Sequence, residues 1–335
     1  MITVAGEALI DLLVENNGSV RARPGGGPFN TARTIGRLGL APAFLGRLSQ
    51  DRFGHLLAAS LDRDGVRLAI PQLADAPTTL AAVDVDASGA PRYRFYLSGT
   101  SSCALGYPLL SAALPAGLTA LHSGSLALVA EPIATSIERL ITIDLPSDTL
   151  VMIDPNCRPE AITDQHAYRA RLSRIQRRAD VVKASLEDLA YLYPGATARH
   201  AATAMLGQGA KLILITDGPR PARAFLAGQQ VSAEVPRVQV VDTIGAGDAF
   251  GGAFLAWWAA NELTKSDLLR TEPVREALQA AAEVASLTCT RAGAEPPWLA
   301  ELTRNLGGRP GSGWPQGTAT PTATWKDRNV GHREA

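Results

Sequence analysis

The sequence predicts an α/β fold in which a mainly parallel central sheet lies between helices, beside a second and smaller β-sheet. The first observation is an alternation between residues 120 and 218, where short apolar runs end in turn residues and are followed by helical segments. This alternation is typical of a parallel sheet that is covered on both faces. The second observation is a pair of hairpin patterns near residues 12–24 and 78–98, which do not fit that layer and predict the smaller sheet. With 335 residues, of which 46% are apolar, the chain can build one large domain or two smaller ones.

The N-terminal elements begin with a strand predicted over residues 2–14, and Asp11 lies where this strand should leave the core. A polar hairpin turn at residues 16–19 and a glycine-rich turn at residues 25–30 follow. Apolar residues at helical spacing then predict helices over residues 31–39 and 51–66, separated by a short strand over residues 41–48.

The hairpin at residues 78–98 alternates around a small turn at residues 87–90. Side chains alternate between the two faces of a strand. Its second strand therefore presents Arg92, Arg94 and Tyr96 on one face, and Tyr93 and Phe95 on the other. The pattern does not decide which face would cover a ligand.

The central sheet is predicted to continue with strands over residues 120–126, 149–156, 179–185 and 211–218. Ligands of open α/β sheets bind at the carboxyl ends of the strands. Five polar residues fall at or just beyond predicted strand ends, namely Asp11, Asn156, Ser185, Asp217 and Asp248. Their shared placement predicts one site that they line together.

Composition excludes several classes of function. The formal net charge is +0, which favours neither a nucleic-acid partner nor a membrane surface. The three cysteines lack metal-ligand or CxxC spacing and are interpreted as buried thiols in a reducing compartment. The N-terminus lacks the features of a signal peptide, and no uncharged apolar run reaches membrane-spanning length. We therefore expect a cytoplasmic protein.

The last thirty residues change in character. Residues 305–335 are rich in Gly, Pro and Thr and predict a disordered tail after a catalytic domain over residues 1–304. Trp314 and Trp325 are the alternative, because either could anchor the tail to the domain.

The glycine-rich loop at residues 242–248, with the sequence DTIGAGD, opens an apolar helix and is the most informative motif. A helix N-terminus binds anions through its unpaired N–H groups, and glycine lets a phosphate approach the backbone. Asp248 would repel a bound anion, so its presence suggests proton abstraction from a hydroxyl during phosphoryl transfer. The alternative is a glycine-rich turn in which Asp248 is a helix cap.

Two segments, GGGPFNTARTIGRLG at residues 25–39 and DTIGAGDAFGGAFLA at residues 242–256, resemble the two signatures of the ribokinase-like (phosphofructokinase-B) carbohydrate kinases. The resemblance spans roughly residues 2–298. It implies a three-layer α/β/α ribokinase-like fold with a small β-sheet lid, formed here by the two predicted hairpins. The GEALIDLL opening is most similar to fructokinase and 2-keto-3-deoxygluconate kinase members. A Walker GxxxxGK[ST] sequence is absent, so the P-loop class is excluded.

The resemblance also assigns catalytic roles. It implies that the backbone of Gly245, Ala246 and Gly247 forms an anion hole and that Asp248 is the general base. Arg158, in the segment DPNCR, would neutralise the transferred phosphoryl group. Its alternative is a surface arginine after a proline turn.

Substrate contacts follow from the same resemblance. It implies that the sugar is bound by Asp11, the Gly25–Gly26 hinge, Asn30, the lid residue Tyr96 and Asn156. Phe29 departs from the usual motif, and could either reshape the pocket or pack beneath it. Trp257, Trp258 and His122 are interpreted as packing residues.

The nucleotide and metal ions complete the implied site. ATP would be contacted by Lys183, Ser185, Thr216, Gly218 and Gly247. Mg²⁺ would be held through water by Glu187 or Asp188, although Ser185 and Asp188 also have the spacing of a helix capping box. Asp242 and the Ile244 carbonyl, with the loop at residues 288–293, resemble a monovalent-cation site that would take K⁺.

These expectations describe an ATP- and Mg²⁺-dependent kinase of a small sugar or sugar acid that phosphorylates a primary hydroxyl, with fructose ranked first. Its partners would be the sugar and ATP, with neither nucleic acid nor membrane, and a homodimer through the lid is left open. A nucleoside kinase or ribokinase is the nearest alternative. A catalytically silent sugar- or nucleotide-binding regulator is the alternative from another class.

Overall fold

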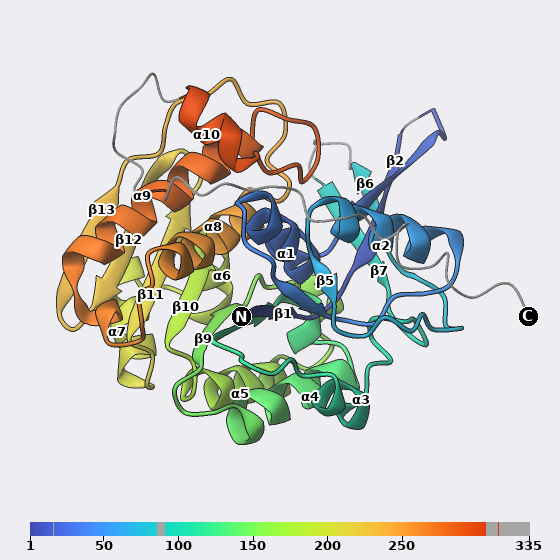
Figure 1. The fold of residues 1–335 in the computed structure, drawn as a ribbon, viewed down its shortest axis with the longest axis horizontal. Helices are drawn as coiled ribbons and strands as arrows, with labels where there is room; N and C mark the ends of the chain where they lie inside the picture. The colour runs from blue at the N-terminus through green and yellow to red at the C-terminus, as the bar shows by residue number, and fades with distance from the viewer. Residues whose placement is uncertain (16, 86–90, 306–313, 315–335) are drawn as a thin grey trace, which may run out of the picture.

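The structure, a computed structural model, describes residues 1–15, 17–85, 91–305 and 314 (Figure 1). A 9-stranded central sheet has the order β13-β12-β11-β10-β9-β8-β1-β4-β5, and a 4-stranded sheet beside it has the order β3-β2-β6-β7. The strands of the central sheet are β1 Ile2–Ala5, β4 Ala43–Leu45, β5 Arg67–Leu68, β8 Ala120–Gly124, β9 Leu150–Asp154, β10 Val181–Ser185, β11 Leu212–Asp217, β12 Arg220–Leu226 and β13 Gln229–Ala233. The strands of the small sheet are β2 Leu9–Val14, β3 Val20–Gly25, β6 Thr79–Val85 and β7 Pro91–Tyr96.

The central sheet is parallel from β5 to β11, as the alternating pattern predicts. The four strands predicted between residues 120 and 218 are confirmed as β8, β9, β10 and β11. The hairpin of β12 and β13, which extends one edge in the antiparallel direction, was not predicted. The fold is therefore mainly, but not wholly, parallel.

Two helical layers cover the central sheet, because strand residues alternate between two apolar clusters. Met152 and Leu214 face one cluster, and their neighbours Ile153 and Ile215 face the other. Residues of the first cluster come from the helices α1 Gly27–Arg37, α2 Arg52–Arg63, α8 Ala246–Ala260, α9 Thr271–Thr288 and α10 Leu299–Asn305. Residues of the second come from α3 Tyr107–Ala112, α4 Ile133–Arg139, α5 Gln165–Gln176, α6 Leu186–Leu192 and α7 Ala198–Gly207 (Figure 1).

The predicted opening strand over residues 2–14 is wrong in one respect, because the chain breaks it into β1 and β2. Gly6 at the break has a φ of 152°, and a Cβ there would lie 2.4 Å from the Cγ of Pro28. β1 pairs with β4 and β8 of the central sheet, whereas β2 pairs with β3 and β6 of the small sheet. The break therefore carries the chain from one sheet to the other.

The two predicted hairpins join into the one small sheet. β2 pairs with β3 and β6 with β7 in the antiparallel direction, and the two hairpins meet through the parallel pairing of β2 with β6. The first hairpin begins at Leu9, earlier than predicted, and residues 86–90 of the second lie outside the described residues. Asp11 consequently lies within a strand of the small sheet, and its predicted position at the end of a central strand is wrong.

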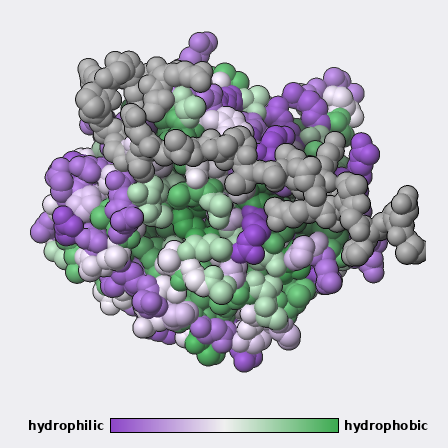
Figure 2. Space-filling view, viewed as in Figure 1, coloured by the Kyte–Doolittle hydropathy of each residue, from purple (hydrophilic) through white to green (hydrophobic). Residues whose placement is uncertain are grey.

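Two further predictions concern the surface and the tail. Within the described residues, no helix has both the length and the apolar character needed to cross a membrane. Apolar residues gather towards the middle of the face seen in Figure 2, with polar residues towards its edges. Most of the predicted tail, including Trp325, lies outside the described residues, but Trp314 is 9% exposed and belongs to the first apolar cluster. At that residue the prediction of a free tail is wrong.

Candidate active site

The N-terminus of α8 forms the floor of the site. Gly245 is its N-cap in the left-handed conformation with φ 77°, and a Cβ there would lie 2.4 Å from the Cβ of Ala294. Only glycine fits both constraints. The Ala246 amide donates to the Thr243 carbonyl at 3.2 Å. The amides of Gly247 and Asp248 have no acceptor among the described residues, so they are the donors that the helix end offers to an anion.

Asp248 lies in the first turn of this helix, and two side-chain amides hold its carboxylate. Asn30 Nδ2 donates to Oδ2 at 2.9 Å, and Asn156 Nδ2 donates to Oδ1 at 3.4 Å. Burial raises the pKa of Asp248, while the hydrogen bond from Asn30 and the charge of Lys183 act in the opposite direction. The result is an oriented carboxylate with a greater affinity for protons than an exposed aspartate.

The two asparagines come from different elements of the fold. Asn30 is in the first turn of α1, whose N-cap is Gly26 with a φ of 108°. Asn156 follows the end of β9 and has a φ of 38°, in the left-handed region that asparagine tolerates better than most residues. The predicted convergence of Asn30, Asn156 and Asp248 is thus found in the structure.

Asp11 approaches the site from the small sheet. Burial raises its pKa to about 6, the charge of Arg158 lowers it, and the charge of Asp248 raises it further. A Cβ on Gly25 would lie 2.1 Å from Asp11 Oδ2, so the carboxylate occupies the space that this glycine leaves empty. Asp11, Gly25 and Gly26 are therefore neighbours, as predicted, and the two carboxylates interact electrostatically across the site.

Arg158 is half-buried and belongs to the same cluster. Its charge lowers the pKa values of both Asp11 and Asp248, and its Nη1 donates to the carbonyl of Cys157 at 3.2 Å. The alternative of an unrelated surface arginine does not agree with this position.

Lys183 is buried beneath the same helix end. Its Nζ forms an ion pair of 2.7 Å with Asp154, and a Cβ on Gly247 would lie 2.9 Å from that Nζ. Burial by itself lowers the pKa of the ammonium, but the carboxylates of Asp154 and Asp188 outweigh it and raise the pKa. The ammonium is 4% exposed at the side chain and already paired, so its predicted contact with the nucleotide remains a prediction.

His122 is a packing residue next to this ion pair. Its pKa falls to about 3 through burial and the nearby charge of Lys183. Trp257 and Trp258, both 2% exposed, pack in the first apolar cluster, as the sequence indicated.

The aromatic residues of β7 show which face of this strand lies near Asp11. Tyr93 is half-buried, and its pKa is raised by burial and then by the charge of Asp11. Tyr93 stacks on Phe95 with ring centroids 5.9 Å apart, whereas Tyr96 is 52% exposed. Tyr93, rather than the predicted Tyr96, is the tyrosine that lies near Asp11. Phe29 packs edge-on against Phe44 at 6.4 Å in the core, so it lies beneath the pocket and does not line it.

Glu7 is a site residue that the sequence interpretation missed. It is 1% exposed, and it accepts hydrogen bonds from the amides of Gly27 at 3.3 Å and Ala127 at 3.0 Å. Burial raises its pKa to about 7, and the Asp248 charge adds to this effect. A carboxylate inside the otherwise apolar opening segment was the available signal.

The predicted nucleotide residues gather at the ends of β10 and β11. Ser185 and Thr216 are register partners, and Gly218 follows with a φ of 54°. Ser185 and Asp188 form the capping box of α6, and Asp188 Oδ1 also accepts from the Cys157 amide at 2.6 Å, whereas Glu187 is exposed. The capping alternative is confirmed. It leaves a magnesium role untested.

Asp242 ties the DTIGAGD loop to the segment after α9. Its Oδ1 accepts from the Ile244 amide at 3.1 Å, and its Oδ2 accepts from the Gly293 amide at 2.8 Å. Arg23 of β3 lies 3.5 Å from the same Oδ2. No cluster of three or more His, Cys, Asp or Glu ligands occurs in the described part of the chain.

The doubly covered sheet and the smaller sheet beside it are the architecture of the ribokinase-like fold. The Asp248 carboxylate at the N-terminus of α8, with Asp11 of the small sheet near it, fits a sugar kinase of this fold. Comparison with known sequences identifies the family: the pfkB family of carbohydrate kinases matches residues 1–301, and the chain belongs to it. The protein is therefore a phosphotransferase.

Individual relatives agree with this assignment. The chain is 36% identical over 265 residues to a fructokinase of Rhizobium leguminosarum bv. trifolii, covering 76% of this chain and 79% of the relative. It is 32% identical to fructokinase-2 of Oryza sativa subsp. japonica, covering 88% and 90% of the two chains.

Solved structures show the same fold. Fructokinase from Xylella fastidiosa with bound ATP matches with a TM-score of 0.81 and 29% identity, covering 91% of this chain and 98% of that one. Fructokinase from Vibrio cholerae O395, bound to fructose, ADP and calcium, matches with a TM-score of 0.78 and 26% identity, covering 90% and 97%.

Proposed function

We propose that this protein transfers the γ-phosphoryl group of ATP to a primary hydroxyl of fructose or a closely similar sugar. The observation that carries the proposal is the Asp248 carboxylate, held by Asn30 and Asn156 at the N-terminus of α8. The choice of fructose is supported by the relatives, which are named fructokinases, and by the fructose-bound structure from Vibrio cholerae.

In the proposed reaction the sugar hydroxyl oxygen attacks the γ-phosphorus, and the bond from that phosphorus to the β-phosphate bridging oxygen breaks. The hydroxyl proton passes to Asp248, and ADP leaves. The raised pKa of Asp248 favours this transfer, because burial disfavours the charged carboxylate. The two amides that orient it fix the base before the hydroxyl arrives.

Several positively charged or partly positive groups lie where the transferred phosphoryl group is expected to bind. The free amides of Gly247 and Asp248 lie at the positive end of the α8 dipole. The Lys183 ammonium lies below Gly247. The Arg158 guanidinium lies near the carboxylates of Asp11 and Asp248. These groups stabilise the phosphoryl group most where its charge is spread in the transition state.

Asp11 is proposed to accept a hydrogen bond from a sugar hydroxyl while Tyr93 covers the ring. Its carboxylate is aimed over the Gly25–Gly26 hinge, and it lies near Asp248 and Arg158. The small sheet thereby holds the acceptor over the helix end.

Metal ions would assist at two places. Asp188 has both oxygens engaged by Cys157 and Ser185, so it fits a contact to Mg²⁺ through water better than direct ligation, and exposed Glu187 is the alternative. Mg²⁺ neutralises the phosphates when it binds with ATP. The oxygens of Asp242 and the Ile244 carbonyl suit a hard monovalent cation such as K⁺, and Asp242 fixes both loops that would surround it.

The test is ADP release with fructose, other hexoses, ribose, 2-keto-3-deoxygluconate and nucleosides. We expect fructose to give the highest kcat/KM, and Asp248→Asn to lower kcat by about 10²–10⁴-fold. Asp267→Asn, which instead removes a carboxylate that accepts hydrogen bonds from Thr264, is the control. Full turnover by Asp248→Asn would exclude it as the base. A higher kcat/KM for ribose or a nucleoside than for fructose would show that fructose is not the substrate. No ADP release with any acceptor would indicate a binding protein.

A further inference from the structure

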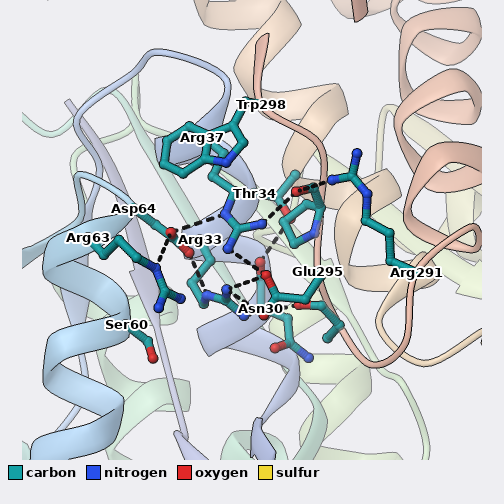
Figure 3. Close-up of polar contacts among 12 residues, drawn as sticks. Asn30, Arg33, Thr34, Arg37, Ser60, Arg63, Asp64, Arg291, Glu295 and Trp298 are labelled. Atoms are coloured by element: carbon teal, nitrogen blue, oxygen red, sulfur yellow. Dashed lines mark hydrogen bonds and ion pairs between the residues drawn. The ribbon is translucent and has the colours of Figure 1, made fainter. Parts of the chain in front are cut away.

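Two arginines of α1 and two carboxylates from distant segments form a ring of ion pairs, and Arg63 contacts the same Asp64 from outside this ring at 3.4 Å (Figure 3). Arg33 Nε lies 2.6 Å from Asp64 Oδ2, and its Nη2 lies 2.9 Å from Glu295 Oε1. Arg37 repeats the arrangement, with Nε 3.1 Å from Asp64 Oδ1 and Nη2 2.6 Å from Glu295 Oε2. We call Arg33, Arg37, Asp64 and Glu295 the α1 brace.

The α1 brace is mostly buried. The side chains of Arg33 and Asp64 are 1% and 0% exposed, that of Arg37 is 6% exposed, and that of Glu295 reaches the surface at 42%. Its formal charges cancel. Such a cluster is not by itself a strong source of stability, because desolvation offsets much of the attraction. The α1 brace is more informative for the way it holds distant segments in fixed positions.

The arginines also hold the segment after α9 by its backbone. Arg33 Nη1 donates to the Ala294 carbonyl at 3.0 Å, and Arg37 Nη1 donates to the Pro296 carbonyl at 2.7 Å. The Arg37 guanidinium stacks over the Trp298 ring at 5.1 Å, as Figure 3 shows. Five contacts to residues 294–298 thus originate from one face of α1.

This held segment forms the underside of the anion-binding helix end. Ala294 lies directly against Gly245, where a Cβ would approach to within 2.4 Å. On the preceding turn of α1, Asn30 donates to Asp248 at 2.9 Å. One helix therefore orients the base with one turn and supports the loop beneath the anion hole with the next two.

We propose that Arg33, with Glu295 as its partner, is a positioning residue for phosphoryl transfer. The α1 brace fixes Ala294 under Gly245, and thereby fixes the Gly247 and Asp248 amides relative to the Asp248 carboxylate. This inference rests on the proposed function of that helix end. Displacements of about 1 Å at reacting groups can cost 10²-fold in rate, so a loosened floor should affect the transition state more than ground-state binding.

Glu295→Gln is the first test variant, because its side chain is partly exposed and the substitution keeps the shape. Replacing the Glu295 carboxylate by an amide removes one negative charge. It also places N–H donors next to the arginine N–H groups, which cannot accept a hydrogen bond. We expect kcat to fall about tenfold, roughly 1.4 kcal/mol in transition-state stabilisation, with KM for sugar and ATP within about twofold. Glu301→Gln is the control for loss of a neighbouring carboxylate, since it removes a 2.7 Å ion pair between Glu301 of α10 and Arg291 and leaves the four residues of the α1 brace unchanged. The glutamine keeps an oxygen that can accept the hydrogen bond which Glu301 accepts from the Trp298 amide.

Arg33→Lys is the second variant, because it keeps the charge but loses the fork that joins Asp64, Glu295 and the Ala294 carbonyl. Amide hydrogen exchange is measured on both variants without substrate. Faster exchange at residues 293–295 together with the kcat loss supports the inference.

Three results would overturn it: an unchanged kcat in Glu295→Gln, a rise in KM alone, or an equal kcat loss in Glu301→Gln. These results are distinguishable from failure of the proposed function, which Asp248→Asn tests in the same assay.

Discussion

The central sheet and the small sheet differ in how burial is distributed along their strands. β1, β8 and β9 are buried at every residue. Along β2 burial decreases from Leu9 to the exposed Val14, and along β3 it increases from the exposed Val20 to Gly25. The small sheet is thus anchored at its base and exposed at its tip, while the central sheet is a fixed platform.

The groups of the proposed site are divided between these two regions. Lys183 lies on the central sheet and Asp248 on helix α8, which packs against that sheet, whereas Asp11 and Tyr93 belong to the small sheet. Segments with few buried contacts open at low free energy, and substrate-covering elements are drawn from such segments. Under the proposed function, the phosphoryl-transfer groups are fixed on the central sheet and α8, and the small sheet covers the sugar. Comparing the effects of substitutions on stability and on KM tests this division.

The largest effect is expected in the platform. Lys183→Met leaves the buried Asp154 carboxyl without its partner, whether it is ionised or protonated, and should lower the free energy of unfolding by about 3–5 kcal/mol. The double variant Lys183→Met with Asp154→Asn should recover most of that loss in denaturant melts. Lys211→Met, which breaks a partly exposed pair of 3.2 Å with Asp180, is the control, with a loss of about 0–1 kcal/mol. Equal losses in both single variants would contradict a buried-pair role.

The next effect separates the small sheet from the platform. Asp11→Asn should raise KM for the sugar by about 10–100-fold, because a hydrogen bond to a charged group is lost. The unfolding midpoint at neutral pH should not fall, since the neutral amide avoids the cost of burying a charged carboxylate, and no described residue donates a hydrogen bond to Asp11. A kcat loss with an unchanged KM would instead place Asp11 in the chemical step.

A pH effect is expected at Glu7, where the two sheets meet. Its pKa is raised from 4.5 to about 7 in the folded state, so its contribution to stability is present below pH 4.5 and is lost as the pH rises through 7. Glu7→Gln removes this titration. Between pH 5 and 8 the wild type should therefore lose about 1–3 kcal/mol relative to the variant in denaturant melts. Asp11 titrates in both proteins, so parallel pH curves would show that Glu7 is not the group responsible.

The smallest effect concerns the C-terminal segment. Trp314→Ala should lower stability by about 1–2 kcal/mol, because apolar burial is lost while the chain regains the freedom that docking removed. Activity on the sugar should be unchanged at 25 °C. An unaltered melting temperature would show that Trp314 does not anchor the segment.

The sequence predicted features that depend on local pattern. The four strands after residue 120 and the helix after Asp51 follow from apolar periodicity and turn residues, and the structure confirms them. The meeting of Asn156 with Asp248 was predicted from the shared end of the sheet, whereas the place of Asn30 was implied by the family resemblance.

Other features depend on contacts between distant residues. The break at Gly6 is set by Pro28, and the choice between Tyr93 and Tyr96 depends on which face of β7 packs towards Asp11. The α1 brace joins residues that lie more than 200 positions apart in the sequence. No local sequence pattern predicts such long-range ion pairs.

The close approach of Asp11 to Gly25 makes these two positions dependent on each other. An added methyl group at residue 25 would lie 2.1 Å from Asp11 Oδ2, so Gly25→Ala is tolerable only if residue 11 is shortened or turns away. A side chain that turns away can no longer make the proposed contact with the acceptor sugar. During divergence of the substrate preference, a change at either position therefore selects for a change at the other, and the pair should vary together or not at all.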